Sequence, residues 1–144
     1  MNTVTDPLVL ANELRPVLLK LARHLRREVH ELDVTAAQVS LLVHIARQPG
    51  IGITELAELE GVSTPHVSKA ADRLVLLGLA YRHRGIDRRR VGLEITPRGD
   101  GVLRSVRKRR TSWLAERLKH LPPEQLELLE EAVAPLERLL EVGQ

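Results

Sequence analysis

The stretch of sequence that decides the fold is ITELAELEGVSTPHVSKAADRLVLLG, residues 53–78. Ser63 or Thr64 can cap a helix whose first turn holds Pro65, because a hydroxyl oxygen accepts from free helix N–H groups and proline is tolerated at a helix start. Before them, Gly61 permits the positive φ that a tight turn between two helices requires. The stretch therefore predicts two short helices joined by a tight turn, the helix-turn-helix form.

The second of these helices has an apolar and a polar face when its residues are placed 100° apart. We expect Asp72 to pair with a nearby arginine, and Leu76 to contact the hairpin or a neighbouring helix. Thr54 is predicted to cap the first helix, and Ala57 is small where the two helices cross. The shared core is predicted to contain Val62, Val67, Ala70, Ala71, Leu74 and Leu77. The outer face carries Pro65, Lys69, Asp72, Arg73 and Leu76.

A basic hairpin follows directly. Residues 79–83 and 91–95 are predicted strands, and apolar residues alternate with polar or small ones in the second, as in a strand with one buried face. RGIDRRR, residues 84–90, reads as the hairpin tip. A two-stranded hairpin beside a recognition helix is called a wing. Its arginines can contact phosphates or enter a narrow minor groove, and Asp87 can fix the orientation of one of them. The arginines are Arg82, Arg84, Arg88, Arg89 and Arg90.

Long helices flank this centre. Leucines at three- and four-residue spacing predict a helix over residues 6–31, in which Pro16 predicts a bend or a break. Residues 35–46 form a second helix that opens with a capping box. Two more helices are predicted over residues 96–120 and 124–142. The fold class is mainly α with a small β-hairpin wing: a winged helix-turn-helix flanked by long N- and C-terminal helices.

Charge is concentrated in the middle of the chain. The formal net charge of the 144 residues is +3, but residues 63–110 carry thirteen basic and four acidic side chains, a balance of +9. Residues 121–144 carry six glutamates and one arginine, a balance of −5. A basic middle between acidic ends indicates a surface that binds a polyanion. The leucine stripes of the terminal helices need a partner surface, and a second copy is the expected partner.

Composition and motifs do not favour an enzyme, a metal-binding protein or a single-strand binder. The chain has no cysteine, which excludes disulfides, thiolate metal sites and cysteine catalysis. Two aromatic residues are too few for the platforms that stack single-stranded nucleic acid. No catalytic triad, paired carboxylates or phosphate loop is evident, and the six histidines lack metal-ligand spacing. We therefore expect no enzyme, cofactor or metal. Without a long apolar segment or a secretory signal, we expect a soluble cytoplasmic protein with no membrane contact.

Over residues 8–140 the sequence resembles the multiple-antibiotic-resistance regulator (MarR) family of winged helix-turn-helix transcription factors. The most specific part is DRRRVGLEITPRG, residues 87–99, which is similar to the family's Asp-x-Arg wing motif, alternating strand and Thr-x-x-Gly helix start. VSTPHVSK, residues 62–69, resembles the start of the family's recognition helix. The resemblance implies that Asp87 orients the wing and that Arg89 enters the minor groove.

The same resemblance carries further implications. Val91, Leu93 and Ile95 would be strand core, and the terminal helices would interlock into a homodimer. A small anionic or aromatic ligand often relieves DNA binding in this family. The lack of cysteine separates the chain from the branch that senses peroxides.

We interpret residues 1–144 as one domain, with residues 33–97 as its DNA-binding part and residues 6–31 and 98–142 as dimerisation helices. The expected function is sequence-specific binding of double-stranded DNA, as a homodimeric repressor on a pseudo-palindromic operator. Predicted DNA-binding residues are Ser63, Thr64, Pro65, His66, Ser68, Lys69, Arg73, Arg84, Asp87, Arg88, Arg89 and Arg90. Alternatives are an architectural protein that binds DNA without sequence preference and a winged-helix module that binds protein.

The predicted fold also offers a place for a small effector ligand. The crevice between the dimerisation helices and the DNA-binding part is the natural cavity. The first helix offers Arg15, Arg23, His24 and Arg27 as anion partners. A chain without any effector is the alternative.

Overall fold

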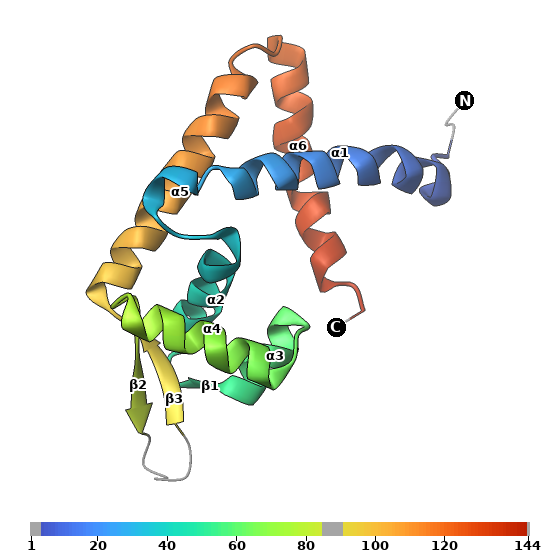
Figure 1. The fold of residues 1–144 in the computed structure, drawn as a ribbon. Helices are drawn as coiled ribbons and strands as arrows, with labels where there is room; N and C mark the ends of the chain where they lie inside the picture. Colours follow the sequence, from blue (N-terminus) through green and yellow to red (C-terminus); the bar gives the residue numbers. More distant parts are fainter. Residues whose placement is uncertain (1–3, 85–90, 144) are drawn as a thin grey trace. The chain divides into compact units, whose positions relative to one another are not determined.

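The computed structural model describes residues 4–84 and 91–143 of the chain, which divides into two compact units after Arg110 (Figure 1). The first unit contains α1 (Pro7–Arg27), a 3-10 turn (His30–Leu32), α2 (Ala36–Arg47), β1 (Ile51–Gly52), α3 (Ile53–Glu60), α4 (Thr64–Leu76), β2 (Ala80–Arg84), β3 (Val91–Ile95) and α5 (Pro97–Leu118) as far as Arg110. The second unit contains the rest of α5 and α6 (Pro123–Glu141). The mainly helical class with a small sheet is confirmed.

Local capping signals begin several helices where the sequence predicts them. The Asp6 carboxylate accepts from the backbone N–H of Leu8 at 2.9 Å. Thr35 makes a reciprocal capping box at the start of α2. The Ser63 hydroxyl accepts from the backbone N–H of His66 at 3.3 Å, so Ser63 caps α4. Gly61, with a φ of 68°, makes the turn between α3 and α4.

Other helix boundaries differ from the prediction. Thr54 does not cap α3, because the N-cap is Gly52 and the helix begins at Ile53. Pro16 does not break α1, which continues as a helix from Pro7 to Arg27. The loss of one hydrogen bond is therefore tolerated within this long helix. After Arg27 the chain makes a separate 3-10 turn instead of continuing to residue 31.

The wing belongs to a three-stranded antiparallel sheet in the order β1-β3-β2, whereas the sequence predicts two strands. Ile51 pairs with Leu93 of the central strand β3. Gly92 is buried because it lies against the backbone of Gly50, where an added Cβ would be 2.3 Å from the carbonyl oxygen. The prediction of Val91 as strand core is wrong, since it is 40% exposed. Burial in β3 therefore does not follow the strict alternation that the sequence predicts.

The core of the first unit joins α2, α3, α4 and the sheet. Ala57 is buried at the crossing of α3 and α4, as predicted. Val62 is 42% exposed, so its predicted place in the core is wrong: it lies in the turn, before α4 begins. The large side chains with almost no exposure are Leu42, Ile45, Ile51, Leu56, Leu74, Leu93, Val29, Val39 and Val67.

Thr96 joins the end of α4 to the start of α5. Its hydroxyl donates to the carbonyl of Gly78 at 2.6 Å and accepts from the N–H of Gly99 at 3.0 Å. Gly99 is buried, and an added Cβ would lie 2.2 Å from the carbonyl oxygen of Leu79. The Thr-x-x-Gly sequence therefore packs α5 directly against the chain that leaves α4.

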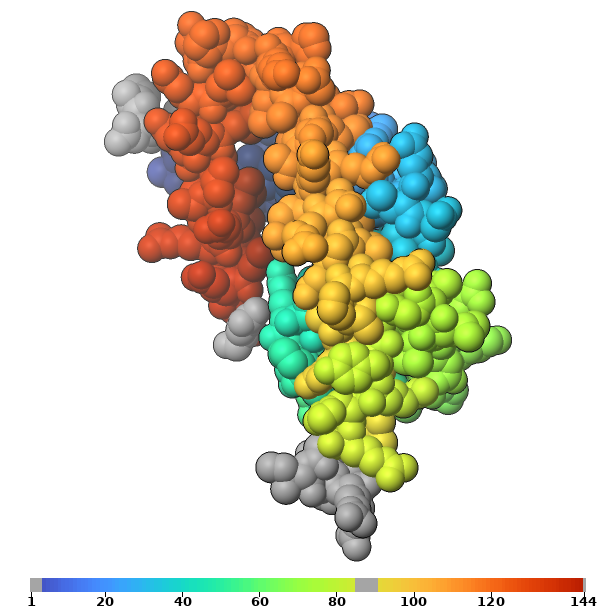
Figure 2. All heavy atoms as spheres, turned by 90° about the vertical axis from the view of Figure 1, so that its left-hand side faces the viewer, coloured from blue at the N-terminus to red at the C-terminus, as the bar shows by residue number. Residues whose placement is uncertain are grey.

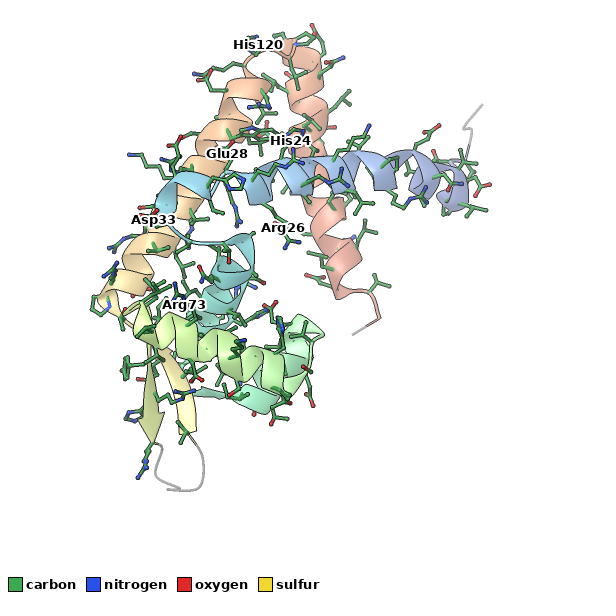
Figure 3. The ribbon with its side chains drawn as sticks, in the orientation of Figure 1. His24, Arg26, Glu28, Asp33, Arg73 and His120 are labelled. Atoms are coloured by element: carbon green, nitrogen blue, oxygen red, sulfur yellow. The ribbon has the colours of Figure 1, made fainter. Side chains whose placement is uncertain are left out.

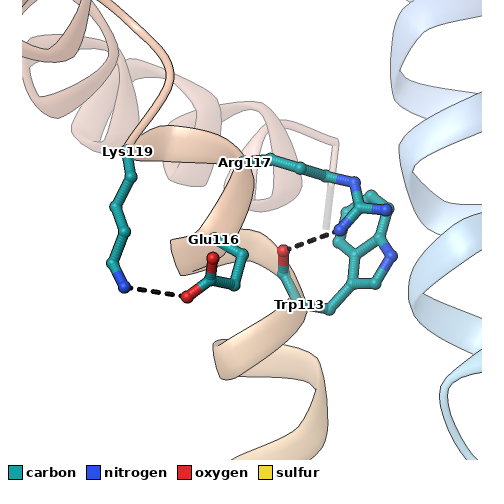
Figure 4. Close-up of polar contacts among 4 residues, drawn as sticks. All are labelled: Trp113, Glu116, Arg117 and Lys119. Atoms are coloured by element: carbon teal, nitrogen blue, oxygen red, sulfur yellow. Dashed lines mark hydrogen bonds and ion pairs between the residues drawn. The ribbon is translucent and has the colours of Figure 1, made fainter.

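In the second unit, side chains on successive turns of α5 contact one another (Figure 4). The Arg117 guanidinium stacks on the Trp113 ring, 3.6 Å from its centroid, a cation–π contact. Lys119 pairs with Glu116 at 2.8 Å. Among the described residues, no helix combines the length and apolar character that crossing a membrane requires.

Candidate nucleic-acid interface

The predicted recognition residues gather on α4, as the helix-turn-helix prediction requires. Ser63, Thr64, Pro65, His66, Lys69 and Arg73 are exposed and Ser68 is half-buried. Val67, Ala71 and Leu74 face the core. The N-terminal half of α4 thus presents small polar side chains, an imidazole and a cation, together with N–H groups that favour an anion.

Strand β2 extends this surface beside α4. Arg82 and Arg84 share one face of β2, because side chains two residues apart in a strand point the same way. On that face, Arg82 donates to the carboxylate of Asp72 on α4, which confirms the prediction that Asp72 pairs with an arginine. Figure 2 shows α4 and β2 side by side, green and yellow-green. Asp87, Arg88, Arg89 and Arg90 lie outside the described residues.

Leu76 ends the outward face of α4, and its predicted contact with the hairpin or a neighbouring helix is wrong. Its side chain is 76% exposed. The side-chain contact between α4 and β2 is instead the ion pair between Asp72 and Arg82. Leu76 lines a shallow hollow on this face together with His66, Lys69, Ala70, Asp72 and Arg73.

The opposite face of β2 carries a different pair. The Tyr81 hydroxyl donates to the Glu94 carboxylate on β3, where the two residues are cross-strand partners. This hydrogen bond, with smaller contributions from desolvation and from the charge of Glu94, raises the pKa of the Tyr81 phenol. The pair fixes β2 against β3 and lies on the face away from Arg82.

Ser40 and His44 of α2 both contact the last residue of α3. The Ser40 hydroxyl donates to Glu60 Oε1 at 2.7 Å, and His44 Nε2 lies 3.2 Å from the same oxygen. Gly61 and the start of α4 follow Glu60 directly. The contacts thus fix the end of α3 at the turn that orients the recognition helix.

A cavity of about 800 Å³ lies within the first unit, lined by α1, the turn after it, α2 and α4. Figure 3 labels three lining residues on separate elements: Arg26, Asp33 and Arg73. Of the residues predicted to bind an anion, Arg23 and Arg27 line the cavity. Arg15, which donates to Asn12, and His24 are not among the lining residues. The charged or titratable side chains of the lining are Arg23, Arg26, Arg27, His30, Asp33 and Arg73.

The sequence analysis missed Arg26, His30 and Arg73 as cavity residues. One helical turn separates Arg23 from Arg26 and Arg27, and this spacing indicates a shared face of α1. No pattern in the sequence brings Arg73 of α4 to the same space, because that proximity depends on packing.

Arg110 of α5 contacts the end of α1, and Arg109 contacts the 3-10 turn that follows it. Arg110 Nε donates to the carbonyl of Leu25 at 3.0 Å, and Arg109 pairs with Glu31 at 2.8 Å. Burial, and secondarily the positive charge of Arg26, lower the pKa of Arg110. Over residues 4–84 and 91–143, no group of three or more His, Cys, Asp or Glu side chains is placed to bind a metal ion.

Comparisons with known proteins match this geometry. A profile of the MarR family matches residues 34–91. Two mycobacterial relatives are similar over 124 residues, which are 85% of this chain and 87% of each relative. They are an uncharacterized HTH-type transcriptional regulator of Mycobacterium leprae, at 28% identity, and an HTH-type transcriptional regulator of Mycobacterium tuberculosis, at 29%.

Solved structures share the fold over nearly the whole chain. A protein of Pseudomonas aeruginosa is 28% identical, with a TM-score of 0.85 over 99% of this chain and 100% of that one. A transcriptional regulator of Thermotoga maritima is 25% identical, with a TM-score of 0.77 over 92% and 94%. Apo MarR of E. coli, at 24% identity and a TM-score of 0.76 over 94% and 98%, shows the fold alone.

The family profile covers the helix-turn-helix and the wing as far as Val91, the first residue of β3, and the relatives extend the similarity along the chain. The resemblance seen in the recognition helix and wing motifs is thereby confirmed. The chain is thus similar to the MarR family of DNA-binding transcriptional regulators over residues 34–91, and the relatives that match 85% of it are transcriptional regulators, not enzymes.

Proposed function

We propose that this regulator is a homodimeric repressor that binds a pseudo-palindromic operator through α4 and the wing. The observation that carries the proposal is the outward face of α4, where exposed polar and cationic side chains adjoin the arginines of β2. The N-terminal half of α4 would enter the major groove, and the wing would contact the flanking minor groove. Because its partner is DNA, the protein would act in the cytoplasm.

Exposed apolar residues on the terminal helices support the homodimer. Burial of apolar surface stabilises by about 25 cal/mol per Å², and extended exposed patches mark interaction sites. A second copy offers the same stripes, so two-fold pairing would cover both at once. On α1 the exposed large apolar residues are Leu8, Val9, Leu10, Val17, Leu18, Leu19 and Leu21. On α6 they are Leu126, Leu128, Leu129, Val133, Leu139 and Leu140.

Selection of bound fragments from the host genome tests this proposal. A homodimeric repressor should recover duplexes that share a pseudo-palindrome, with half-sites about 10 base pairs apart. It should prefer them to unrelated duplex by about 10³-fold or more and reduce transcription from them in vitro. Equal affinity for every duplex would indicate an architectural protein, and negligible affinity at low salt a protein-binding module.

Arg89→Ala should weaken operator binding by about tenfold or more, because a minor-groove arginine contributes both charge and shape recognition. The dimer should stay intact. Gel-shift titration measures the affinity, and sedimentation measures the dimer. Arg104→Ala, an equal charge change at an exposed position of α5, serves as the control and should have a much smaller effect. Equal affinities of Arg89→Ala and the parent would remove Arg89 from the interface.

The cavity beside α1 supports release by a small anionic ligand. Four arginines and one aspartate line it, so its charge is unbalanced. Its volume of about 800 Å³ is in the range of small-molecule sites. Arg73 lines both this cavity and the hollow on the outward face of α4. An anion that draws Arg73 into the cavity would withdraw a cation from the DNA side.

Benzoate, as a small aromatic anion, should therefore release the operator. Arg27→Ala should raise the benzoate concentration for half-release by about tenfold, because it removes a charge-assisted hydrogen bond. Arg15→Ala is the matched control, since Arg15 lies on the same helix outside the lining. Fluorescence anisotropy of labelled operator gives the release curves. Identical curves for the two variants, or equal release by neutral benzamide, would contradict an anion site at Arg27.

A further inference from the structure

Asp72 is an acidic residue on the outward face of α4, where the neighbouring side chains are cationic or neutral. Lys69 and Arg73 line the same hollow, and Leu76 lies one turn further on. The Asp72 side chain is 60% exposed. A carboxylate on a surface that approaches phosphates repels the ligand of that surface. Tight DNA binding alone therefore does not account for an acid at this position.

The carboxylate of Asp72 joins the recognition helix to the wing. It accepts from Arg82 Nη2, and Arg82 stands in β2 opposite Leu93 of β3. The backbone of Arg82 is thus held by the sheet while its guanidinium is held by α4. Arg84, two residues closer to the hairpin tip, shares the same face of β2. The ion pair consequently links the elements proposed to read the major and the minor groove.

Folding stability is a weak explanation for this pair. The Arg82 side chain is 40% exposed, and exposed ion pairs contribute little to the free energy of unfolding. The ion pair is not part of the core beneath α4, which consists of apolar side chains such as the buried Val67, Ala71 and Leu74. The consequence of the pair is therefore expected in DNA binding, where charge and orientation at this surface matter most.

We propose that Asp72 sets the specificity of DNA binding by positioning Arg82 and by opposing phosphates of unrelated DNA. The inference rests on the proposed function, in which α4 and the wing contact duplex. On the operator, base contacts fix one register, in which phosphates lie clear of the carboxylate and the ion pair is kept. On unrelated DNA the protein is held by phosphates in many registers, and the carboxylate is repelled in these. Asp72 thus acts as a positioning residue, and its main effect is to weaken binding to unrelated DNA.

Asp72→Asn tests the inference, since it keeps the shape of the side chain and removes its charge. Affinities are measured by anisotropy over a range of salt, for a selected operator and for an unrelated duplex of equal length. Affinity for the unrelated duplex should rise by roughly fivefold, and its salt dependence should steepen by about one ion. Affinity for the operator should stay level or fall. The ratio of the two affinities should therefore drop by about fivefold or more.

Asp100→Asn is the matched control, because it makes the same charge change at an exposed position of α5. It should leave the ratio unchanged. Asp72→Glu should keep the ratio close to that of the parent chain. When Arg82 is already Gln, Asp72→Asn should still lower the ratio, because the repulsion between the carboxylate and the phosphates of unrelated DNA does not depend on Arg82. An equal rise in unrelated-DNA affinity for Asp72→Asn and Asp100→Asn would overturn the inference, because net charge alone would then explain the data.

The failure of this inference is distinguishable from the failure of the proposed function. A parent chain that prefers its operator, with an Asp72→Asn variant that prefers it equally, would overturn the role of Asp72 only. A parent chain with no preference for any duplex would overturn both.

Discussion

Gly99→Ala is expected to lower the free energy of unfolding by about 3 kcal/mol or more, which is the upper range for overpacking a close-packed site. The added Cβ would lie 2.2 Å from the carbonyl oxygen of Leu79 and 2.6 Å from Cγ1 of Ile95. The Leu79 carbonyl cannot easily move away from the added Cβ, because it accepts a hydrogen bond from the N–H of Thr96 at 3.1 Å. The substitution would therefore separate α5 from the chain that joins α4 to β2.

Thermal and denaturant unfolding monitored by circular dichroism measure this effect. Gly101→Ala is the matched control two residues further along α5, where the nearest atom to an added Cβ is Arg104 Nη2 at 3.9 Å. There alanine should stabilise the helix by about 0.5–1 kcal/mol. If Gly99→Ala were also neutral or stabilising, the close contact between α5 and Leu79 would be refuted.

Local signals predict most helix ends correctly, because capping involves residues that are neighbours in the chain. The hydroxyls of Thr35, Ser63 and Thr96 all accept at the predicted helix starts. The positive φ values of Gly61 and Gly78 follow equally from their own sequence context. These contacts span about three residues, so the sequence alone is sufficient to locate them.

Features that depend on distant residues were not predictable in this way. Strand β1 has two residues, too few for any periodic pattern, and it exists because it pairs with β3. Burial of Gly92 depends on Gly50, which is far away in the chain. Leu76 is exposed although its position in the sequence predicts a contact. Tertiary packing decides each of these positions, and propensity is only a weak guide to them.

The candidate interface follows from the sequence to a greater extent than the cavity does. The predicted recognition residues between Ser63 and Arg73 lie on α4 or at its N-cap, so helical periodicity is enough to place them on a common surface. The cavity combines α1, α2 and α4, and Arg73 reaches it only through their packing. Charge patterns thus indicate which residues bind an anion, whereas the shape of a binding site requires the fold.

Val133→Glu is expected to raise the dissociation constant of the proposed dimer by at least about 100-fold, because it would bury an unpaired carboxylate in an apolar interface. Val133 is 54% exposed in the single chain. It shares one side of α6 with Leu126, Leu129 and Leu140, which recur at three- and four-residue spacing. Sedimentation equilibrium at micromolar concentration would detect the monomer. Operator affinity should fall with it, since a monomer holds one half-site and loses the gain from bivalent binding.

Ala134→Glu introduces the same charge at the adjacent residue and separates the effect of position from that of charge. Ala134 is exposed and lies on the side of α6 that already carries Glu127, Glu130 and Glu141. A dimer built on the apolar stripe should tolerate this substitution, and both variants should keep the helical content of the parent chain. If Val133→Glu dimerised as tightly as Ala134→Glu, the stripe on α6 would not be the dimer contact. The exposed apolar residues of α1 would then have to be covered in another way.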